Sequence, residues 1–272
     1  MLAHVAVRSR QFSIEYEWIA GPGAAPLLVF LHEGLGSVAM WRDWPRMLCR
    51  AGGFRGLVYS RPGYGHSSPR SRDEKWPVDY MHSQAIDVLP AFLHAVGIDT
   101  QSEPPWLIGH SDGASIALIH AAAFPQRVAG LVALAPHVFV EDLSIKSIER
   151  AREVYVTTDT HTPGLAVKLG RYHRDPDSAF WGWNDVWLDP AFRAWNIEDW
   201  LQSIAKPVLA VQGEDDEYGT MAQLDSITMH VPHAQILTLA DCGHSPQRDQ
   251  PQRVIEATLE FIERHSPRRL PK

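Results

Sequence analysis

The stretch that decides the fold is PWLIGHSDGASIALIHAAAF, residues 105–124. Its apolar segment Trp106–Ile108 predicts a buried strand, and the alanine-rich half that follows predicts a buried helix. Between them stands Ser111, two residues after Gly109 and two residues before Gly113. A serine on such a sharp strand-to-helix turn is held in a strained conformation, which persists mainly at functional sites. The start of the helix also stabilises negative charge, so the stretch predicts that Ser111 is a nucleophile.

The composition is that of an ordinary globular protein, with 45% hydrophobic and 21% charged residues in a chain of 272. This length fits one large α/β domain with an insertion, or two small domains. The net charge of −7 argues against a nucleic-acid binder, which usually carries a basic stripe. The basic cluster at 264–272 lies in a proline-containing tail and is expected to be a solvated terminus. Two cysteines, Cys49 and Cys242, give neither a disulfide framework nor a metal-binding spacing.

The N-terminal residues MLAHVAVRSRQF lack the apolar core of a signal peptide. No apolar run approaches the roughly 18 residues of a membrane span. A cytoplasmic protein is therefore expected, with no membrane or nucleic-acid partner. Its expected partner is a small-molecule substrate, and the chain is expected to be a monomer or a homodimer.

Apolar runs alternate with helical patterns along most of the chain, which predicts a mostly parallel, doubly wound sheet of eight strands. Besides the strand within residues 105–124, the predicted strands are 4–9, 12–20, 26–32, 56–60, 128–135, 207–213 and 235–240. The predicted helices are 38–51, 79–96 and two that begin at Thr220 and Pro246.

One segment breaks this alternation, because no strand is evident from 137 to 206. We interpret 137–206 as a helical cap inserted after the sixth strand, with 1–136 and 207–272 forming the core. Five of the ten tryptophans fall in the cap: Trp181, Trp183, Trp187, Trp195 and Trp200. At least half of them are expected to pack inside the cap. We expect at least one of the first three to face Ser111, because ligand pockets are mostly apolar and aromatic.

A nucleophilic serine needs a base to take its proton, and that base needs an orienting carboxylate. Two later predicted strands end in suitable residues. Glu214-Asp215-Asp216 follows the strand that ends at Gly213, and His244 follows the last strand. The carboxyl ends of parallel strands meet at one edge of the sheet, where such folds place their sites.

With these residues in place, the chain resembles the α/β-hydrolases with a helical cap. The motifs that carry the resemblance span almost the whole chain: LHEGLGS (31–37), RPGYGHS (61–67), GHSDG (109–113), GEDD (213–216) and CGHSP (242–246). The resemblance implies a triad of Ser111, His244 and Asp216, with Asp215 as the alternative acid. It also implies the α/β-hydrolase fold.

Two N–H groups are expected to stabilise the oxyanion of a tetrahedral intermediate. One is the backbone N–H of Asp112, directly after the nucleophile, and the resemblance implies Gly34 as the other. The chain departs from the family at Glu33, where glycine is usual. We expect Glu33 to point away and hold the loop; the alternative is contact with a polar or cationic substrate group. His137 is a candidate substrate contact or else a hydrogen-bonded structural histidine.

A competing motif, Gly-x-Gly-x-x-Ala at 34–39, matches the dinucleotide-binding pattern after a strand. It follows the third predicted strand, and it leaves Ser111, Asp216 and His244 unexplained. The fourteen histidines show no paired metal-ligand spacing. No cofactor and no metal are therefore expected.

These features predict a serine hydrolase that cleaves a small or medium carboxylic ester with an apolar or aromatic part. Three alternatives stay open because fold does not fix function. One is hydrolysis of a carbon–carbon bond in a vinylogous diketone with the same triad. Another is cofactor-free, oxygenase-like chemistry of a His-Asp pair. The third is a ligand-binding receptor that has kept the triad residues.

Overall fold

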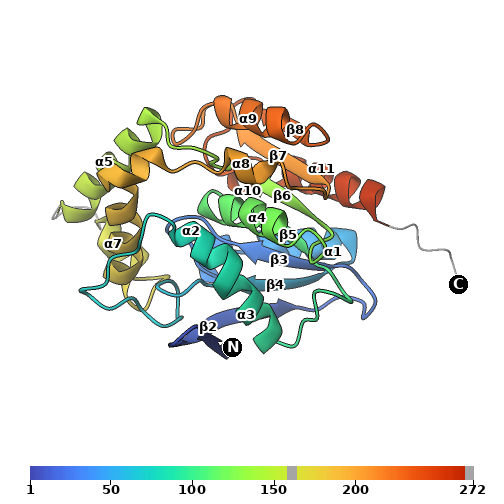
Figure 1. Ribbon diagram of the computed structural model, residues 1–272, viewed down its shortest axis with the longest axis horizontal. Coiled ribbons are helices and arrows are strands. Elements are labelled where there is room, and N and C mark those ends of the chain that lie inside the picture. The colour runs from blue at the N-terminus through green and yellow to red at the C-terminus, as the bar shows by residue number, and fades with distance from the viewer. Residues whose placement is uncertain (158–163, 267–272) are drawn as a thin grey trace, which may run out of the picture.

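The computed structural model describes residues 1–157 and 164–266, and its centre is one eight-stranded sheet (Figure 1). The strand order is β1-β2-β4-β3-β5-β6-β7-β8. The first two strands pair antiparallel with each other and β2 pairs antiparallel with β4, whereas all other pairs are parallel. The predicted mostly parallel α/β sheet is confirmed. The strands are β1 Leu2–Val7, β2 Arg10–Ile19, β3 Leu27–Leu31, β4 Arg55–Tyr59, β5 Trp106–His110, β6 Gly130–Leu134, β7 Val208–Gly213 and β8 Gln235–Leu239.

Both faces of the sheet are buried, which explains why its central strands are unbroken apolar runs. In β3, Leu27, Val29 and Leu31 pack into one cluster, while Leu28 and Phe30 pack into the other. The first face is covered by α2 Tyr80–Ser83, η2 Gln84–Val88, α3 Leu89–Ala95, α4 Asp112–Ala123 and α9 Ala222–His230. The opposite face is covered by α1 Trp44–Gly52 and α11 Pro251–His265, which contact each other.

Two predicted helices differ in detail from the structure. The helix expected at 38–51 is a 3₁₀ turn, η1 Ala39–Trp41, followed by α1, because Arg42 takes a positive φ of 54° between them. The helix expected at 79–96 is continuous, but its middle segment η2 is a π-helix. Neither change moves a strand end that carries a candidate site residue.

The segment between β6 and β7 holds the helices expected of a cap: α5 Asp142–Val156, α6 Leu165–Leu169, α7 Pro176–Trp187, η3 Pro190–Ala194 and α8 Glu198–Leu201. Extended pairing in its described part is limited to one isolated bridge between Phe139 and Asn196. Helices α5 and α7 contact each other and stand at one end of the molecule, at the left of Figure 1. Residues 158–163 of the predicted cap lie outside the described residues. No helix in the described ranges has the length and apolar character needed to span a bilayer.

Candidate active site

Ser111 stands between the end of β5 and the start of α4, in a conformation that L-residues rarely adopt. Its φ is 53° and its ψ is −120°. A side chain at Gly109 would overlap the backbone of Ala114, and one at Gly113 would overlap the carbonyl of Leu31. The two glycines therefore let the turn pack tightly against the helix and the neighbouring strand, which holds the strained serine in place.

Three side chains from different strand ends form a continuous chain of hydrogen bonds. His244, which follows β8, lies with Nε2 2.9 Å from the hydroxyl of Ser111. Its Nδ1 lies 2.8 Å from Oδ1 of Asp216, which follows β7. With Nδ1–H donating to the carboxylate, Nε2 is free to accept the proton of Ser111. This is the geometry that activates a serine for attack on a carbonyl carbon.

The carboxylate of Asp216 is buried and held by several donors. Its Oδ1 also accepts from the backbone N–H groups of Tyr218 at 2.8 Å and Gly219 at 3.2 Å, and its Oδ2 accepts from Gln212 at 3.2 Å. Burial acts to raise the pKa of Asp216, but the hydrogen bond and charge of His244 outweigh it, so the pKa is lowered. Asp215, the alternative acid, is exposed and does not contact His244 in the structure.

The loop that carries His244 is fixed by two carboxylates that the sequence analysis did not single out. Glu217 accepts the backbone N–H of His244 at 3.1 Å, and Asp249 accepts that of Gly243 at 3.1 Å. In the sequence, Glu217 follows Asp216 and Asp249 lies close to His244, and no pattern distinguishes either from an ordinary acidic residue. Their contacts depend on how two loops meet, which no local pattern indicates.

Gly34 and Asp112 both line the cavity that contains Ser111. Within the described residues, neither backbone N–H has a backbone or side-chain acceptor. A side chain at position 34 would overlap the indole nitrogen of Trp183, so only glycine fits there. Two unpaired donors beside the serine form an arrangement suited to a developing oxyanion.

A fully buried arginine links the two segments that carry these N–H groups, and the sequence analysis missed it. Arg61 donates to the carbonyl of Glu33 at 2.9 Å and lies 3.7 Å from Oδ2 of Asp112. The same carboxylate accepts the hydroxyl of Tyr80 at 2.5 Å. The side chain of Asp112 therefore points away from Ser111, and its charge is partly balanced by Arg61.

Glu33 pairs with His110, the residue before Ser111. Oε2 of Glu33 lies 3.5 Å from Nδ1 of His110, and Nε2 of His110 donates to the carbonyl of His244 at 2.7 Å. Burial acts to raise the pKa of Glu33, but the hydrogen bond and charge of His110 lower it to about 2. Burial acts to lower the pKa of His110, but Glu33 overcomes it and the pKa is raised. The pair thus neutralises a carboxylate that would otherwise oppose an oxyanion.

Glu33 forms an ion pair with His110, in agreement with the expectation that it holds the loop, and it also lines the cavity over Ser111.

We predict that Glu33→Gln lowers the melting temperature more at about pH 5.5 than at about pH 9. The pKa of His110 is raised in the folded protein, so its protonated form stabilises the fold. This stabilisation is complete below the ordinary pKa of 6.5 and is lost as the pH rises through the pKa of His110 in the folded state. The pKa of Glu33 is lowered in the folded protein, so its ionised form stabilises the fold. This stabilisation is complete above the ordinary pKa of 4.5 and is lost as the pH falls towards about 2.

Both contributions are therefore complete between pH 4.5 and 6.5. The expected loss there is on the order of 1 kcal/mol, or about 2–4 °C, measured by thermal denaturation. Glu17→Gln is the matched control, because it removes an exposed pair with Arg46 and should change little at either pH. Equal losses for Glu33→Gln at the two pH values would contradict the ionised pair.

The cavity over Ser111 has a volume of about 110 Å³ and is closed partly by helices α5 and α7. Its lining brings together Glu33, Gly34, Leu35, His110, Ser111, Asp112, His137, Ile148, Trp183, Trp187, Tyr218, His244 and Ser245. Of the three candidate tryptophans, Trp183 and Trp187 line this cavity and Trp181 does not. Trp181 packs instead against Tyr155 and Phe180, with Arg152 over its ring. Residues 183 and 187 lie one helical turn apart on one face of α7, whereas 181 points to the other side.

His137 is buried between the rings of Trp187 and His244, at 5.1 Å and 5.6 Å between centroids. Burial lowers its pKa to about 4, so the imidazole is neutral at ordinary pH. Nε2 donates to the carbonyl of Tyr218 at 3.2 Å, while Nδ1 has no partner among the described residues. His137 is therefore a hydrogen-bonded wall of the cavity, with one acceptor atom still unpaired.

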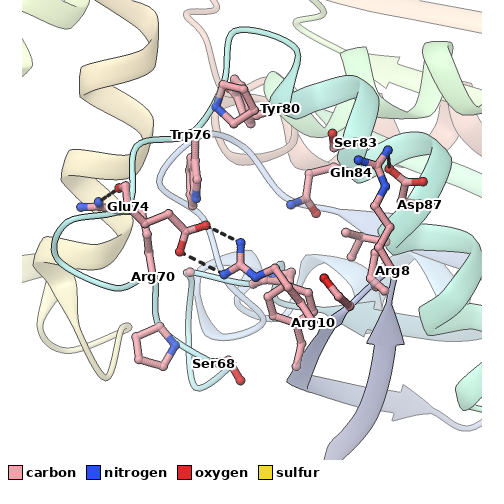
Figure 2. A pocket seen from close by; sticks show the side chains of 18 residues that line it. Arg8, Arg10, Ser68, Arg70, Glu74, Trp76, Tyr80, Ser83, Gln84 and Asp87 are labelled. Carbon is pink, nitrogen blue, oxygen red and sulfur yellow. Dashed lines mark hydrogen bonds and ion pairs between the residues drawn. The ribbon is translucent and has the colours of Figure 1, made fainter.

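A separate cavity of about 230 Å³ lies on the other side of Tyr80 (Figure 2). Trp76 stacks on Tyr80 with ring centroids 5.7 Å apart, and the Arg10–Glu74 ion pair crosses the cavity. The hydroxyl of Tyr80 donates to Asp112 and accepts the indole N–H of Trp187. Asp112 and Trp187 both line the cavity over Ser111, which we call the catalytic cavity. Tyr80 thus lies between the two internal spaces.

A mostly parallel sheet that presents a serine, a histidine and an aspartate at its strand ends defines a class of hydrolytic enzymes. A model described as "Alpha/beta hydrolase family" matches residues 28–257, and the chain therefore belongs to the alpha/beta hydrolase family. It is a hydrolase.

Relatives named as hydrolases match the chain at low identity, and a solved structure shares its fold. The chain is 22% identical over 265 residues to 2-hydroxy-6-oxo-6-phenylhexa-2,4-dienoate hydrolase of Burkholderia cepacia, covering 89% of each chain. It is 19% identical over 281 residues to monoacylglycerol lipase ABHD6 of Bos taurus, covering 94% of this chain and 81% of the relative. A thermophilic esterase from Thermogutta terrifontis superposes with a TM-score of 0.74 at 18% identity, over 98% of this chain and all of the other.

Proposed function

We propose that this hydrolase cleaves carboxylic esters through a covalent acyl-enzyme on Ser111. The observation that carries the proposal is the unbroken hydrogen-bond chain from Ser111 through His244 to Asp216, with distances of 2.9 Å and 2.8 Å. The two unpaired N–H groups of Gly34 and Asp112 beside the serine support it.

In the proposed mechanism, His244 takes the proton of Ser111 as the oxygen attacks the carbonyl carbon. The oxyanion is stabilised by the N–H groups of Gly34 and Asp112, and the anionic Asp216 stabilises the imidazolium. His244 then gives its proton to the leaving alcohol. In the second half-reaction it takes a proton from water, whose oxygen attacks the acyl-enzyme and releases the acid and Ser111.

The size of the catalytic cavity indicates a small acyl group. A cavity of about 150 Å³ holds one benzene molecule, and this cavity measures about 110 Å³. We infer that segment 137–206 acts as the cap and that Trp183 and Trp187 limit the acyl chain. The test is a series of 4-nitrophenyl esters from acetyl to decanoyl, for which kcat/KM should be highest at the short end. No hydrolysis of any member would refute the proposal.

A second candidate is hydrolysis of a carbon–carbon bond, favoured by the relative from Burkholderia cepacia that is named for such a substrate. The same triad and N–H groups would serve that reaction. The cavity of about 110 Å³ argues for the ester, because a phenyl-bearing acyl group is larger than this space. Assay of 2-hydroxy-6-oxo-6-phenylhexa-2,4-dienoate beside 4-nitrophenyl acetate distinguishes the two.

We predict that Trp183→Leu shifts the preference towards longer acyl chains, because it removes an indole from the wall of the catalytic cavity. The ratio of kcat/KM for hexanoyl to acetyl esters should rise by roughly 10-fold or more, the usual effect of about 1–3 kcal/mol from one pocket contact. Trp181→Leu is the matched control on the same helix, since Trp181 does not line the cavity, and it should leave the ratio unchanged. An unchanged ratio in Trp183→Leu would show that the acyl group lies elsewhere.

A further inference from the structure

A second and larger space adjoins the catalytic cavity. This cleft measures about 310 Å³ and shares three lining residues with the catalytic cavity: Glu33, His110 and Ser245. Its apolar lining comes from η1, α1, the cap and the start of α11: Met40, Trp41, Trp44, Met47, Tyr172 and Pro251. The two spaces together fit a substrate with a small part over Ser111 and a larger part in the cleft.

The cleft is suited to an aromatic group. Trp41 and Trp44 stack with ring centroids 5.8 Å apart and an angle of 19° between their planes. Both are held in the core beneath the cleft, so they present rigid surfaces rather than side chains that must be ordered on binding. A space of about 310 Å³ exceeds the roughly 150 Å³ that a benzene ring needs, whereas the catalytic cavity does not.

The charges around the cleft favour an anionic group on that aromatic part. Arg42 and Arg248 line it, and neither has a carboxylate within 4.0 Å among the described residues. Glu33 is balanced by His110, which leaves Asp43 as the one unbalanced carboxylate in this lining against two unbalanced guanidinium groups.

The position of the cleft assigns it to the leaving group. His244 must protonate the leaving oxygen, so the alcohol lies on the side of its imidazole. The cleft is lined by Ser245, Gln247 and Arg248, which lie within four residues after His244, and it shares Ser245 with the cavity over Ser111. The acyl side is the catalytic cavity, closed by Trp183 and Trp187.

We propose that the cleft is a leaving-group subsite for an aromatic alcohol that bears a carboxylate or a similar compact anion, bound by Arg42 and Arg248. The proposal rests on the proposed ester hydrolysis and names the substrate class of that site. The reaction is ordinary: the ester and water give the small acid and the anionic phenol or benzyl alcohol. The larger product leaves first, and the small acyl group stays on Ser111.

The test compares three acetyl esters of matched shape: 4-acetoxybenzoate, neutral phenyl acetate and cationic 4-acetoxy-N,N,N-trimethylanilinium. For each ester, kcat/KM of the wild type is divided by that of the Arg42→Gln/Arg248→Gln variant, which cancels differences in chemical reactivity between esters. The ratio should be about tenfold for 4-acetoxybenzoate and within about twofold for phenyl acetate. About 0.5 M NaCl should reduce the first ratio, because the arginines are exposed.

Arg50→Gln/Arg253→Gln is the matched control. It removes the same charge from exposed positions on α1 and α11 that do not line the cleft. Equal ratios for benzoate and phenyl esters would overturn the proposal. So would a loss by the control pair equal to that of the cleft pair, or a wild-type-to-variant ratio for the cationic ester as large as that for 4-acetoxybenzoate, which would show that the arginines do not act through their charge.

The subsite is tested separately from the chemistry by the binding of 4-hydroxybenzoate, measured by titration calorimetry. It should bind the wild type more tightly than phenol does, and about tenfold more tightly than it binds Arg42→Gln/Arg248→Gln. If no ester is hydrolysed but this difference is observed, the proposed function fails and the anionic subsite stands. If esters are hydrolysed without it, only the subsite fails.

Discussion

Ser111→Ala is expected to lower kcat for 4-nitrophenyl acetate by roughly 10⁴–10⁶-fold. The serine is the one triad member that forms a bond to the substrate, and alanine offers His244 no proton to take. The fold should be retained, because within the described part of the chain the Ser111 hydroxyl hydrogen-bonds to His244 alone, and alanine adds no bulk in the same backbone conformation. Steady-state kinetics gives the rate, and circular dichroism of the variant checks the fold.

A fluorophosphonate probe with mass spectrometry identifies the serine that reacts. It should label Ser111 in the wild type and nothing in Ser111→Ala. Ser245→Ala is the matched control, because Ser245 also lines the catalytic cavity next to His244 and should not affect labelling. Labelling of Ser111→Ala at its former level would rule out Ser111 as the nucleophile.

Asp216→Asn is expected to lower kcat on the order of 10⁴-fold, with little change in the binding of the ester. The asparagine amide can be placed in two ways, and both impair His244. With its oxygen in place of Oδ1 it loses the charge that stabilises the imidazolium. With its nitrogen there, it faces the N–H groups of Tyr218 and Gly219 and favours the wrong tautomer of His244.

Asp215→Asn is the control for this prediction. Its side chain is exposed, so the variant should keep kcat within about threefold of the wild type, as surface changes usually do. If Asp215→Asn were the more damaging change, the two aspartates would exchange their assigned roles. The pH dependence of kcat in each variant gives a second measurement of how His244 is oriented.

The sheet was predictable because its central strands are buried on both faces and stand out as apolar runs between turns. The same runs predicted that Ser111, the acidic residues 214–216 and His244 lie together, since parallel strands bring their carboxyl ends to one edge. The choice of Asp216 among the acidic residues came from the resemblance to the α/β-hydrolases. The structure adds the distances that join these side chains. The break at Arg42 was not predictable, because a positive φ at a non-glycine residue depends on packing around it rather than on its own type.

The contacts of Arg61 and Glu217, which support the site, could not be predicted from the sequence for a different reason. Arg61 and Glu217 act on residues of other loops, so their partners are determined by tertiary structure. Among the three candidate tryptophans, helical periodicity separates Trp181 from the other two, because it places 183 and 187 on one face of the helix and 181 on another. The pairing of Glu33 with His110 explains how the chain tolerates a carboxylate where its family usually has glycine.

Tyr80 gives the fold a short evolutionary route to new substrates. One side chain lies between a space of about 110 Å³ over the serine and one of about 230 Å³ beneath the first hairpin (Figure 2). A descendant with a smaller residue at this position would inherit the elbow, the triad and both oxyanion donors while gaining room for a longer acyl chain. It would also need a new partner for Asp112, which loses the tyrosine hydroxyl. Specificity and catalytic chemistry can therefore diverge separately in this lineage, because they depend on different residues.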